Sequence, residues 1–183
     1  MDFERVVRVV LEGVERHKIR YAVLGGFALG ALGVPRTTMD LDFLVHRDDL
    51  DALHQHLIGV GYTLRVRTEN VSHYRHADPA WGSVDLLHAF RSYSLEMLER
   101  ARVYPAFGGT LQMKELQPED VIGFKIQAVA NNPLRAARDA LDVEALMSHY
   151  RHRLDWNHIQ EFYELFERGE EGRRMRERFD HAE

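Results

Sequence analysis

The sequence predicts an α+β (α/β) protein with a β-sheet core and a helical C-terminal part, and three observations support this class. Segments with strand-like alternation and segments with helical periodicity follow one another up to about residue 115. From Pro118 onward the periodicity is helical. Hydrophobic residues make up 45% of the 183 residues, enough for a buried core. We therefore expect an α/β core over residues 1–115 and a helical subdomain over residues 116–183, packed on the core.

Strands are expected in the core where apolar residues form short runs or alternate with polar ones, and helices where they recur every three or four positions. Taken in order, the expected core elements are a helix, a strand, a short helix, a strand, a helix, three strands, a helix and a strand, over residues 3–17, 21–24, 27–32, 40–46, 48–60, 62–68, 72–76, 83–88, 94–102 and 110–114. Asp48 is expected to cap the helix that ends near Val60, because aspartate accepts hydrogen bonds from free N–H groups at a helix start.

Helices are expected throughout the C-terminal part, over residues 118–131, 134–150 and 155–168 and, more weakly, in a charged tail through Phe179. Pro118 suits the first turn of a helix, and the acidic residues that follow it complement the helix dipole. The charge-dense stretch 167–178 is interpreted as a solvated helix or a frayed tail.

The charge balance argues against a dedicated nucleic-acid binder. The chain has 24 basic and 29 acidic residues and a formal net charge of −5, whereas stable DNA binding needs a basic surface. Stable DNA binding is therefore not expected, although RNA remains a candidate as a transient substrate. The chain contains no cysteine, so disulfides, thiol catalysis and thiolate metal sites are excluded.

The sequence also predicts a cytoplasmic protein without a membrane span. The uncharged stretch over residues 21–34 is shorter than the roughly twenty residues that cross a bilayer, and glycines interrupt it. The first residues, Met1 to Arg5, include acidic side chains and lack the basic start of a signal peptide.

Two carboxylates in one strand are the strongest functional signal. Asp40 and Asp42 are two positions apart, so they point to the same side of a strand while Leu41 and Phe43 point to the core. Two such charges repel each other, and a cation relieves the repulsion. Mg²⁺ is the expected cation, because it takes hard oxygen ligands and often binds carboxylates together with substrate phosphates.

A third carboxylate, Asp85, lies in an otherwise apolar strand, where a carboxylate without a partner is costly if buried. A shared ion site with Asp40 and Asp42 would explain it. Three carboxylates around two metal ions can activate an attacking oxygen and stabilise departing pyrophosphate at phosphorus. The pattern thus predicts nucleotidyl transfer, with Asp85 as third metal ligand and candidate base.

The residues before this strand are candidates for phosphate binding. Gly25 and Gly26 lie between a strand and a helix, where absent side chains let backbone N–H groups approach a phosphate. Arg36 and Thr38 lie on the segment that returns from the glycines to Asp40. All four residues are predicted to contact the nucleotide.

The helical part supplies one further candidate. Lys125 lies among apolar residues on the inward stripe of its expected helix, and its long stem could carry the ammonium to the triphosphate. It is an equally good interpretation that the Lys125 side chain only extends its ammonium to solvent and has no functional role. Arg138 and Asp142, four residues apart on the next helix, are expected to support the site's rim or to form an ordinary helix pair.

The order of a glycine pair, an Asp-x-Asp pair and a later aspartate resembles the signature of the DNA polymerase β superfamily of nucleotidyltransferases. The string from Arg36 to Asp42 is similar to the Arg-x-Thr/Ser-x-Asp-x-Asp string of a small stand-alone branch related to AbiEii-type toxins. Also similar to that branch are a helical lysine, here Lys125, and the stretch 135–142 that follows it. The superfamily more often has Gly-Ser where this chain has Gly25-Gly26.

The resemblance implies a nucleotidyltransferase fold with a mixed β-sheet flanked by helices. It also implies Mg²⁺ dependence, with two ions expected and Mn²⁺ as an alternative, and a nucleoside triphosphate donor. The acceptor would be a hydroxyl of RNA, protein or a small molecule, and the role could be that of a toxin–antitoxin or phage-defence component with a cognate antitoxin.

Other interpretations of the same residues remain open. The three aspartates could be ordinary surface residues, although the glycine turn upstream favours metal binding. The chain could be a catalytically silent binding module with this fold, such as an antitoxin or regulatory partner, or a phosphohydrolase. The histidines lack convincing zinc spacing, but His73 and His88 are candidates for contact with the acceptor.

Overall fold

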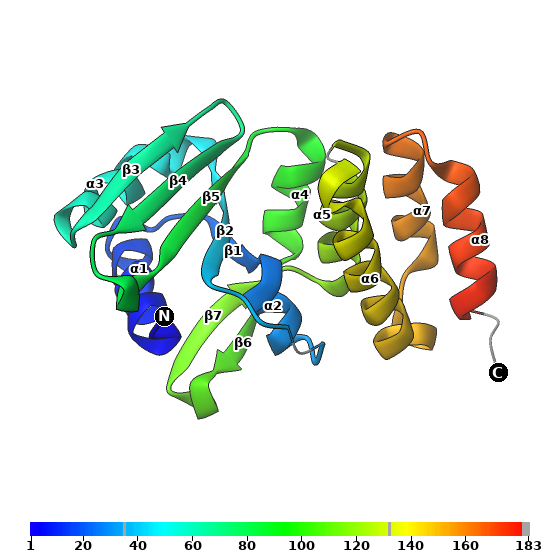
Figure 1. Cartoon of the computed structure of the whole chain (residues 1–183), viewed down its shortest axis with the longest axis horizontal. Helices are drawn as coiled ribbons and strands as arrows, with labels where there is room; N and C mark the ends of the chain where they lie inside the picture. Colours follow the sequence, from blue (N-terminus) through cyan, green and yellow to red (C-terminus); the bar gives the residue numbers. More distant parts are fainter. Residues whose placement is uncertain (35, 132, 181–183) are drawn as a thin grey trace. The chain divides into compact units, whose positions relative to one another are not determined.

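A computed structural model describes residues 1–34, 36–131 and 133–180, and Figure 1 traces its elements. The chain divides into two compact units. The first unit comprises residues 1–31 and 36–116 and contains the sheet, and the second comprises residues 32–35 and 117–183 and contains the C-terminal helices.

The first unit is built on a mixed sheet of seven strands within the described residues, in the order β3-β4-β5-β2-β1-β7-β6. The strands β1 to β7 span Tyr21–Leu24, Asp40–His46, Tyr62–Arg67, Val71–His76, Ser83–Ala89, Arg102–Ala106 and Leu111–Glu115. Two pairs are parallel, β2 with β5 and β1 with β7, and the remaining neighbours are antiparallel. The mixture of strand directions and the helices around the sheet confirm the expected α+β class.

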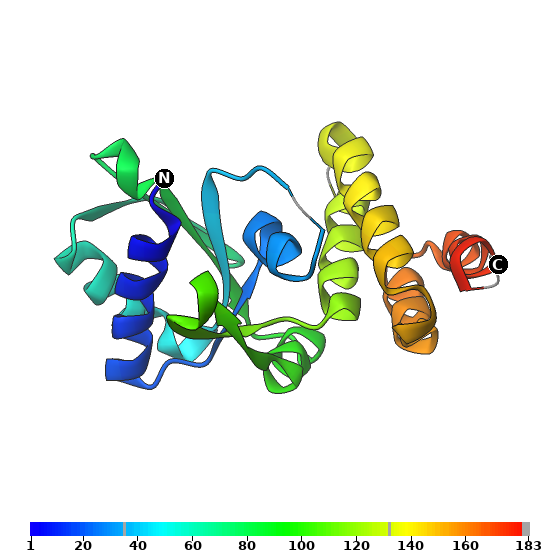
Figure 2. The same ribbon diagram turned by 90° about the horizontal axis from the view of Figure 1, so that it is seen from below.

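Helices α1 (Phe3–His17) and α3 (Leu50–Gly59) pack their apolar sides into the main core of the sheet, and α1 can be followed along it in Figure 2. Asp2 caps α1, because its carboxylate accepts a hydrogen bond from the backbone N–H of Arg5. From the sheet, Leu41 and Phe43 contribute to the same core and are fully buried. This face of the sheet is therefore closed to a polar ligand.

The expected cap of α3 was wrong. Asp48 lies in a short 3-10 turn, η1 (Arg47–Asp49), and Asp49 occupies the cap position without a side-chain cap bond. The carboxylate of Asp49 instead accepts two side-chain hydrogen bonds of 2.8 Å from Arg20, and these bonds lower the pKa of Asp49 below its ordinary value. A long-range partner thus replaced the local capping bond.

Helix α4 and strand β6 also differ from expectation. Helix α4 spans Ser92–Arg100, two residues earlier than expected, because the Ser94 hydroxyl accepts hydrogen bonds from the N–H groups of Phe90 and Arg91 and fixes the first turn. Strand β6 was not expected at all, since Pro105 interrupts the strand pattern. Proline is tolerated there because β6 lies at the edge of the sheet, where one side of the strand needs no partner.

Glu115, at the end of β7, is a buried carboxyl group inside the first unit. Its side chain is 1% exposed, and its Oε1 has no hydrogen-bond partner among the described residues. Burial raises the pKa of Glu115 from its ordinary 4.5 to about 7. The folded state therefore keeps a proton that the unfolded chain releases at lower pH.

The free energy of unfolding is expected to fall as the pH rises from about 4.5 to 7, because over this range only the folded state still binds the proton of Glu115. At about 1.4 kcal/mol per pKa unit, the loss is on the order of 3 kcal/mol. Glu115→Gln should remove this component of the slope in urea unfolding between pH 5 and 8. Glu99 is exposed, so Glu99→Gln is the control and should keep the wild-type pH dependence of stability. If Glu115→Gln also kept that pH dependence, the raised pKa of Glu115 would be contradicted.

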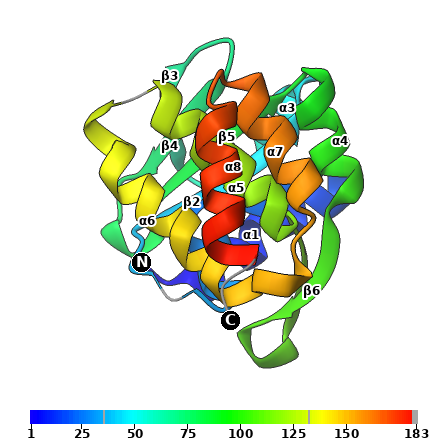
Figure 3. The ribbon, with the colours of Figure 1, turned by 90° about the vertical axis from the view of Figure 1, so that its right-hand side faces the viewer.

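The second unit contains four long helices within the described part of the chain, α5 (Pro118–Asn131), α6 (Pro133–Tyr150), α7 (Trp156–Leu165) and α8 (Gly169–Asp180). Figure 3 shows α7 and α8 side by side. The weakly expected tail is thus a regular helix, and Phe179 is 7% exposed although its neighbours are charged. The Tyr150 hydroxyl donates a hydrogen bond of 3.1 Å to the carbonyl of Leu32, which ties Leu32 to this unit.

Among the residues that the model describes, no helix is both long enough and apolar enough to cross a membrane.

Candidate active site

The register of the sheet brings the predicted carboxylates onto one face. Asp42 on β2 is paired in register with Asp85 on β5, and Asp40 is paired with Ser83 two positions away. Residues that face each other across strands, and residues two apart along a strand, point to the same side. Asp40, Asp42 and Asp85 therefore share a face, although more than forty residues of chain separate the first from the last.

This shared face is the one opposite the main core. The intervening residues Leu41, Phe43, Val84 and Leu86 point to the other side, where they join the core with α1 and α3. All three carboxylate residues are partly exposed, and the side chain of Asp85 is 22% exposed. The strand alternation thus puts the charges toward solvent and the apolar residues into the core.

His73 on β4 extends the row of polar side chains, because it is paired in register with Asp85. The Nδ1 of His73 lies 2.8 Å from Oδ1 of Asp85 and fixes the orientation of that carboxylate. The turn around Pro79 is the sequence signal that points to this contact, since a hairpin centred there places residue 73 opposite residue 85. The turn does not fix the register by itself, and the pairing of His73 with Asp85 is known only from the structure.

His88, the other histidine considered for the acceptor, lies elsewhere. It is paired in register with Val45 and so points to the core face, opposite to Asp85. Its ring bonds to the Ser72 hydroxyl and the Glu69 carbonyl, both at 2.9 Å. Burial lowers the pKa of His88, so a neutral structural histidine replaces the expected contact with the acceptor.

Gly25 opens helix α2 (Gly25–Ala31) in a backbone conformation that favours glycine, with φ of 73°. The carboxylate of Asp42 occupies the space that a Cβ on Gly25 would need. The glycine is therefore required twice, once for the turn and once for the close approach of the Asp42 side chain to the backbone.

Gly26 is required by its neighbour on the returning segment. A Cβ on Gly26 would lie 2.8 Å from Cβ of Thr38, too close for real atoms. Thr38 in turn anchors the start of β2, because its hydroxyl donates a hydrogen bond of 3.2 Å to the carbonyl of Asp40. The glycine pair, Thr38 and the aspartates are thus packed against one another.

Gly25→Ala is expected to lower the free energy of unfolding by about 1–3 kcal/mol, since alanine is strained at positive φ and its Cβ would displace the Asp42 carboxylate. The matched control is Gly30→Ala in the same helix, where a Cβ meets no atom within 4 Å. Gly30→Ala should be neutral or stabilising by up to about 1 kcal/mol. Urea unfolding measures both, and equal midpoints for the two variants would contradict the argument.

Arg36, the remaining phosphate-binding candidate of the first unit, is half-buried and lines a cavity of about 690 Å³ together with Gly26 and Thr38. The cavity therefore borders the segment that joins the glycine pair to Asp40.

Lys125 and its neighbours form a separate buried cluster in the second unit. The Nζ of Lys125 lies 2.7 Å from Oδ1 of Asp139 and 2.7 Å from Oδ2 of Asp142. Lys125 is 8% exposed and Asp139 is 1% exposed. Arg138 and Asp142 were expected to act together as a pair on one helix. In the structure Asp142 instead binds Lys125, and Arg138 is exposed.

The three aspartates fit Mg²⁺ by their chemistry, because they offer hard oxygen donors on one accessible face beside a glycine turn. In the structure itself, no three histidine, aspartate or glutamate side chains among the described residues are placed to hold one metal ion together. Asp42 lies against Gly25 and Asp85 against His73.

Similar folds occur among solved nucleotidyltransferases. The lincosamide antibiotic adenylyltransferase LnuA with lincomycin bound has a TM-score of 0.58 and 15% identity, covering 80% of this chain and 97% of its own. ANT(2")-Ia in complex with adenylyl-2"-tobramycin has a TM-score of 0.62 and 13% identity, covering 89% and 95%. A nucleotidyltransferase-like antigenic protein from Paracoccidioides brasiliensis has a TM-score of 0.54 and 18% identity, covering 97% and 96%. At these identities the likeness establishes the fold alone.

The sequence matches a protein-family model described as "Uncharacterised nucleotidyltransferase" over residues 3–165. The match includes every residue considered above for metal or phosphate binding. A comparison with curated proteins found no similar sequence.

Proposed function

The chain belongs to this nucleotidyltransferase family, and from that premise we propose that it transfers a nucleoside monophosphate from a nucleoside triphosphate to a hydroxyl of a small-molecule acceptor. The observation that carries the proposal is the row of aspartates on one face of the sheet, with Asp42 and Asp85 in register and Asp42 in contact with Gly25. This arrangement puts the charged groups beside the turn that is suited to a phosphate.

Asp40 and Asp42 would hold Mg²⁺, and Asp85 would serve as the third ligand and as the base for the acceptor hydroxyl. Two ions are proposed, and Mn²⁺ could replace Mg²⁺. Bound Mg²⁺ would offset the negative charge that develops on the phosphates during displacement. His73 orients Asp85 through the 2.8 Å contact, so it is proposed as a positioning residue.

The triphosphate would be bound by the start of α2 and the segment before β2. Gly25 and Gly26 open α2 and carry no side chains of their own, and helix starts favour anions. Thr38 offers a hydroxyl and Arg36 a guanidinium on the same segment. For Lys125 we propose a structural role, because two carboxylates already offset its charge.

A small-molecule acceptor is proposed over RNA or protein for one reason. Two proteins of similar fold are described as an adenylyltransferase of lincosamide antibiotics and as a complex with adenylyl-2"-tobramycin, both of which concern small molecules with hydroxyl groups. No observation favours a toxin–antitoxin or phage-defence role, a cognate antitoxin or a relation to AbiEii-type toxins, so these are not part of the proposal.

The test is a transfer assay with each α-labelled nucleoside triphosphate, Mg²⁺ and a panel of hydroxylated small molecules, including aminoglycosides and lincosamides. The expected result is label on one acceptor with release of pyrophosphate. Release of inorganic phosphate without labelled product would identify a phosphohydrolase. No turnover, together with partner binding that needs no metal, would identify a silent binding module and overturn the proposal.

A further inference from the structure

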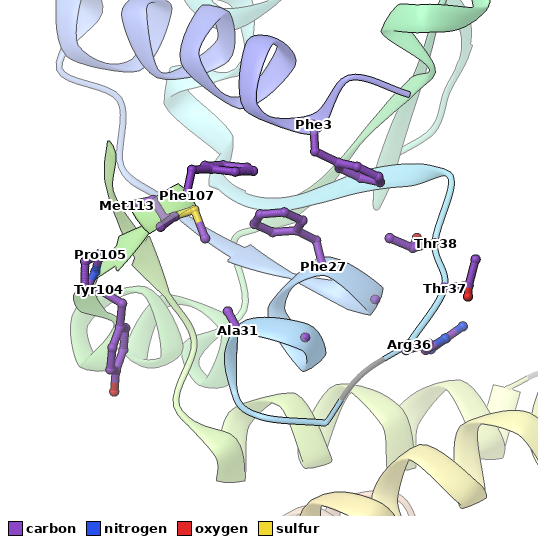
Figure 4. Close-up of a pocket in the computed structure, with 13 residues that line it drawn as sticks. Phe3, Phe27, Ala31, Arg36, Thr37, Thr38, Tyr104, Pro105, Phe107 and Met113 are labelled. Atoms are coloured by element: carbon purple, nitrogen blue, oxygen red, sulfur yellow. The ribbon is translucent and has the colours of Figure 1, made fainter. Parts of the chain in front are cut away.

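A cavity of about 690 Å³ in the first unit has no part in the roles assigned above to the aspartates. It lies between the start of α1, helix α2 and the β6–β7 hairpin with its 3-10 turn η3 (Phe107–Gly109), as Figure 4 shows. Its volume is within the usual range for a small-molecule site, roughly 300–1,000 Å³. The cavity is therefore large enough for a ligand with one or two fused rings.

Aromatic rings form the wall of this cavity. The ring of Phe27 stacks on that of Phe3 at a centroid distance of 5.6 Å and tilts against that of Phe107 at 5.7 Å. All three side chains are only partly buried, and Met113 adds a polarisable thioether beside them. Partly exposed aromatic faces bind planar ring systems well.

The backbone at Phe107 is unusual for such a residue. Its φ is 51°, in the left-handed region that a large side chain occupies only with backbone strain. Gly108 and Gly109 follow with positive φ as well, so glycine or asparagine would suit position 107 better for stability alone. The strain is explained if the ring is needed at the cavity.

Arg36 and two threonines form the polar side of the cavity. Arg36, Thr37 and Thr38 lie along it in Figure 4, and none of the described residues that line the cavity is acidic. A guanidinium on this side of the cavity, across from the aromatic wall, favours a planar ligand that carries a negative group at one edge.

From these features we propose that the cavity binds a planar aromatic small molecule with an anionic substituent, whose ring lies on Phe27 and Phe107 and whose charge faces Arg36. The proposal concerns binding and does not depend on nucleotidyl transfer. Gly26 and Thr38 belong both to the cavity and to the packed group around the aspartates, so a bound ligand would touch the segment that positions Asp40. Nucleotides and aromatic acids both have this chemistry.

The test uses 8-anilinonaphthalene-1-sulfonate, an aromatic anion whose fluorescence rises in an apolar site, with the whole folded protein and neither nucleotide nor metal. Saturable binding at one site per chain is expected. Gly30→Leu and Ala31→Leu place bulk at two positions that line the cavity, and at Gly30 a Cβ meets no atom within 4 Å. At least one of these variants should weaken binding about tenfold, a change of about 1.4 kcal/mol.

The matched control is Gly59→Leu, since Gly59 is also helical and its Cβ would also meet no atom within 4 Å, but it is remote from the cavity lining. It should change the affinity for the probe by no more than about twofold, well below the tenfold loss expected when the cavity is filled. Phe107→Asn keeps a residue that tolerates positive φ and removes the ring, so binding should weaken. Urea unfolding checks that this variant is folded. Arg36→Gln should weaken the sulfonate probe but not its neutral analogue N-phenyl-1-naphthylamine.

Competition then identifies the source of the ligand. Displacement of the probe by ATP without metal would assign the cavity to a nucleotide, and displacement by aromatic acids but not by ATP would assign it to an acceptor. Absence of saturable binding, or unchanged binding in both Gly30→Leu and Ala31→Leu, would overturn the proposal. Because no turnover is measured, this failure is separate from a failure of the transfer assay.

Discussion

Asp40→Asn is expected to reduce nucleotidyl transfer by about 10³-fold or more while the protein remains folded. Asparagine preserves the size of the side chain but removes the charge that would hold the metal ion, and an ion of this kind contributes several kcal/mol to the transition state. Asp40 is partly exposed on the face opposite the core, so the substitution disturbs no apolar packing. The measurement is label transfer from the α-labelled triphosphate, with urea unfolding as a check on the fold.

The matched control for this prediction is Asp48→Asn. Asp48 is an exposed aspartate of the same unit, with 75% of its side chain accessible, and it lies outside the row of aspartates. Its replacement should leave transfer unchanged. A Mg²⁺-dependent thermal shift with ATP provides a second measurement, which Asp42→Ala should abolish. Transfer by Asp40→Asn at the wild-type rate would refute the assignment of the active site.

Lys125→Met is expected to lower the free energy of unfolding by about 3–5 kcal/mol, because it removes the ammonium that lies 2.7 Å from both the Asp139 and the Asp142 carboxylates. Methionine matches the apolar stem of lysine, so the loss arises from the missing ammonium rather than from a cavity. Asp139 is 1% exposed, and solvent therefore cannot replace the lysine there. Urea unfolding without nucleotide measures the effect apart from any role in phosphate binding.

A compensated variant separates charge from packing in this cluster. Combining Lys125→Met with Asp139→Asn and Asp142→Asn removes all three charges, and this should recover a large part of the lost stability. The exposed Arg138 offers the control Arg138→Met on the same helix as both aspartates, with an expected change below about 0.5 kcal/mol. A wild-type midpoint for Lys125→Met alone would show that the cluster contributes little to stability.

Local patterns were sufficient where a residue's role depends on its immediate neighbours. The alternation of Asp40 and Asp42 with Leu41 and Phe43 predicted both the strand and the two faces of its side chains, and the structure has that strand at residues 40–46. The periodicity of the first helix likewise predicted its bounds, residues 3–17. In both cases burial of one apolar face stabilises the element, and the period of that face is visible in the sequence.

Local patterns failed where a distant residue competed. Asp49 occupies the cap position of α3, but its carboxylate binds Arg20, twenty-nine residues earlier in the chain. Pro105 concealed β6, because only its edge position in the sheet makes proline acceptable. Neither the partner of Asp49 nor the edge position of β6 can be derived from neighbouring residues.

The amino-acid sequence alone was enough to predict the α+β class, most of the strands and helices, and the two carboxylates of one strand, because these depend on hydrophobic periodicity over a few residues. Strand register and long-range packing established the rest. They set Asp85 opposite Asp42 and beside His73, pressed Asp42 against Gly25, and paired Lys125 with two aspartates of the next helix. They also formed the aromatic cavity, since Phe3, Phe27 and Phe107 meet only when three separate segments pack together.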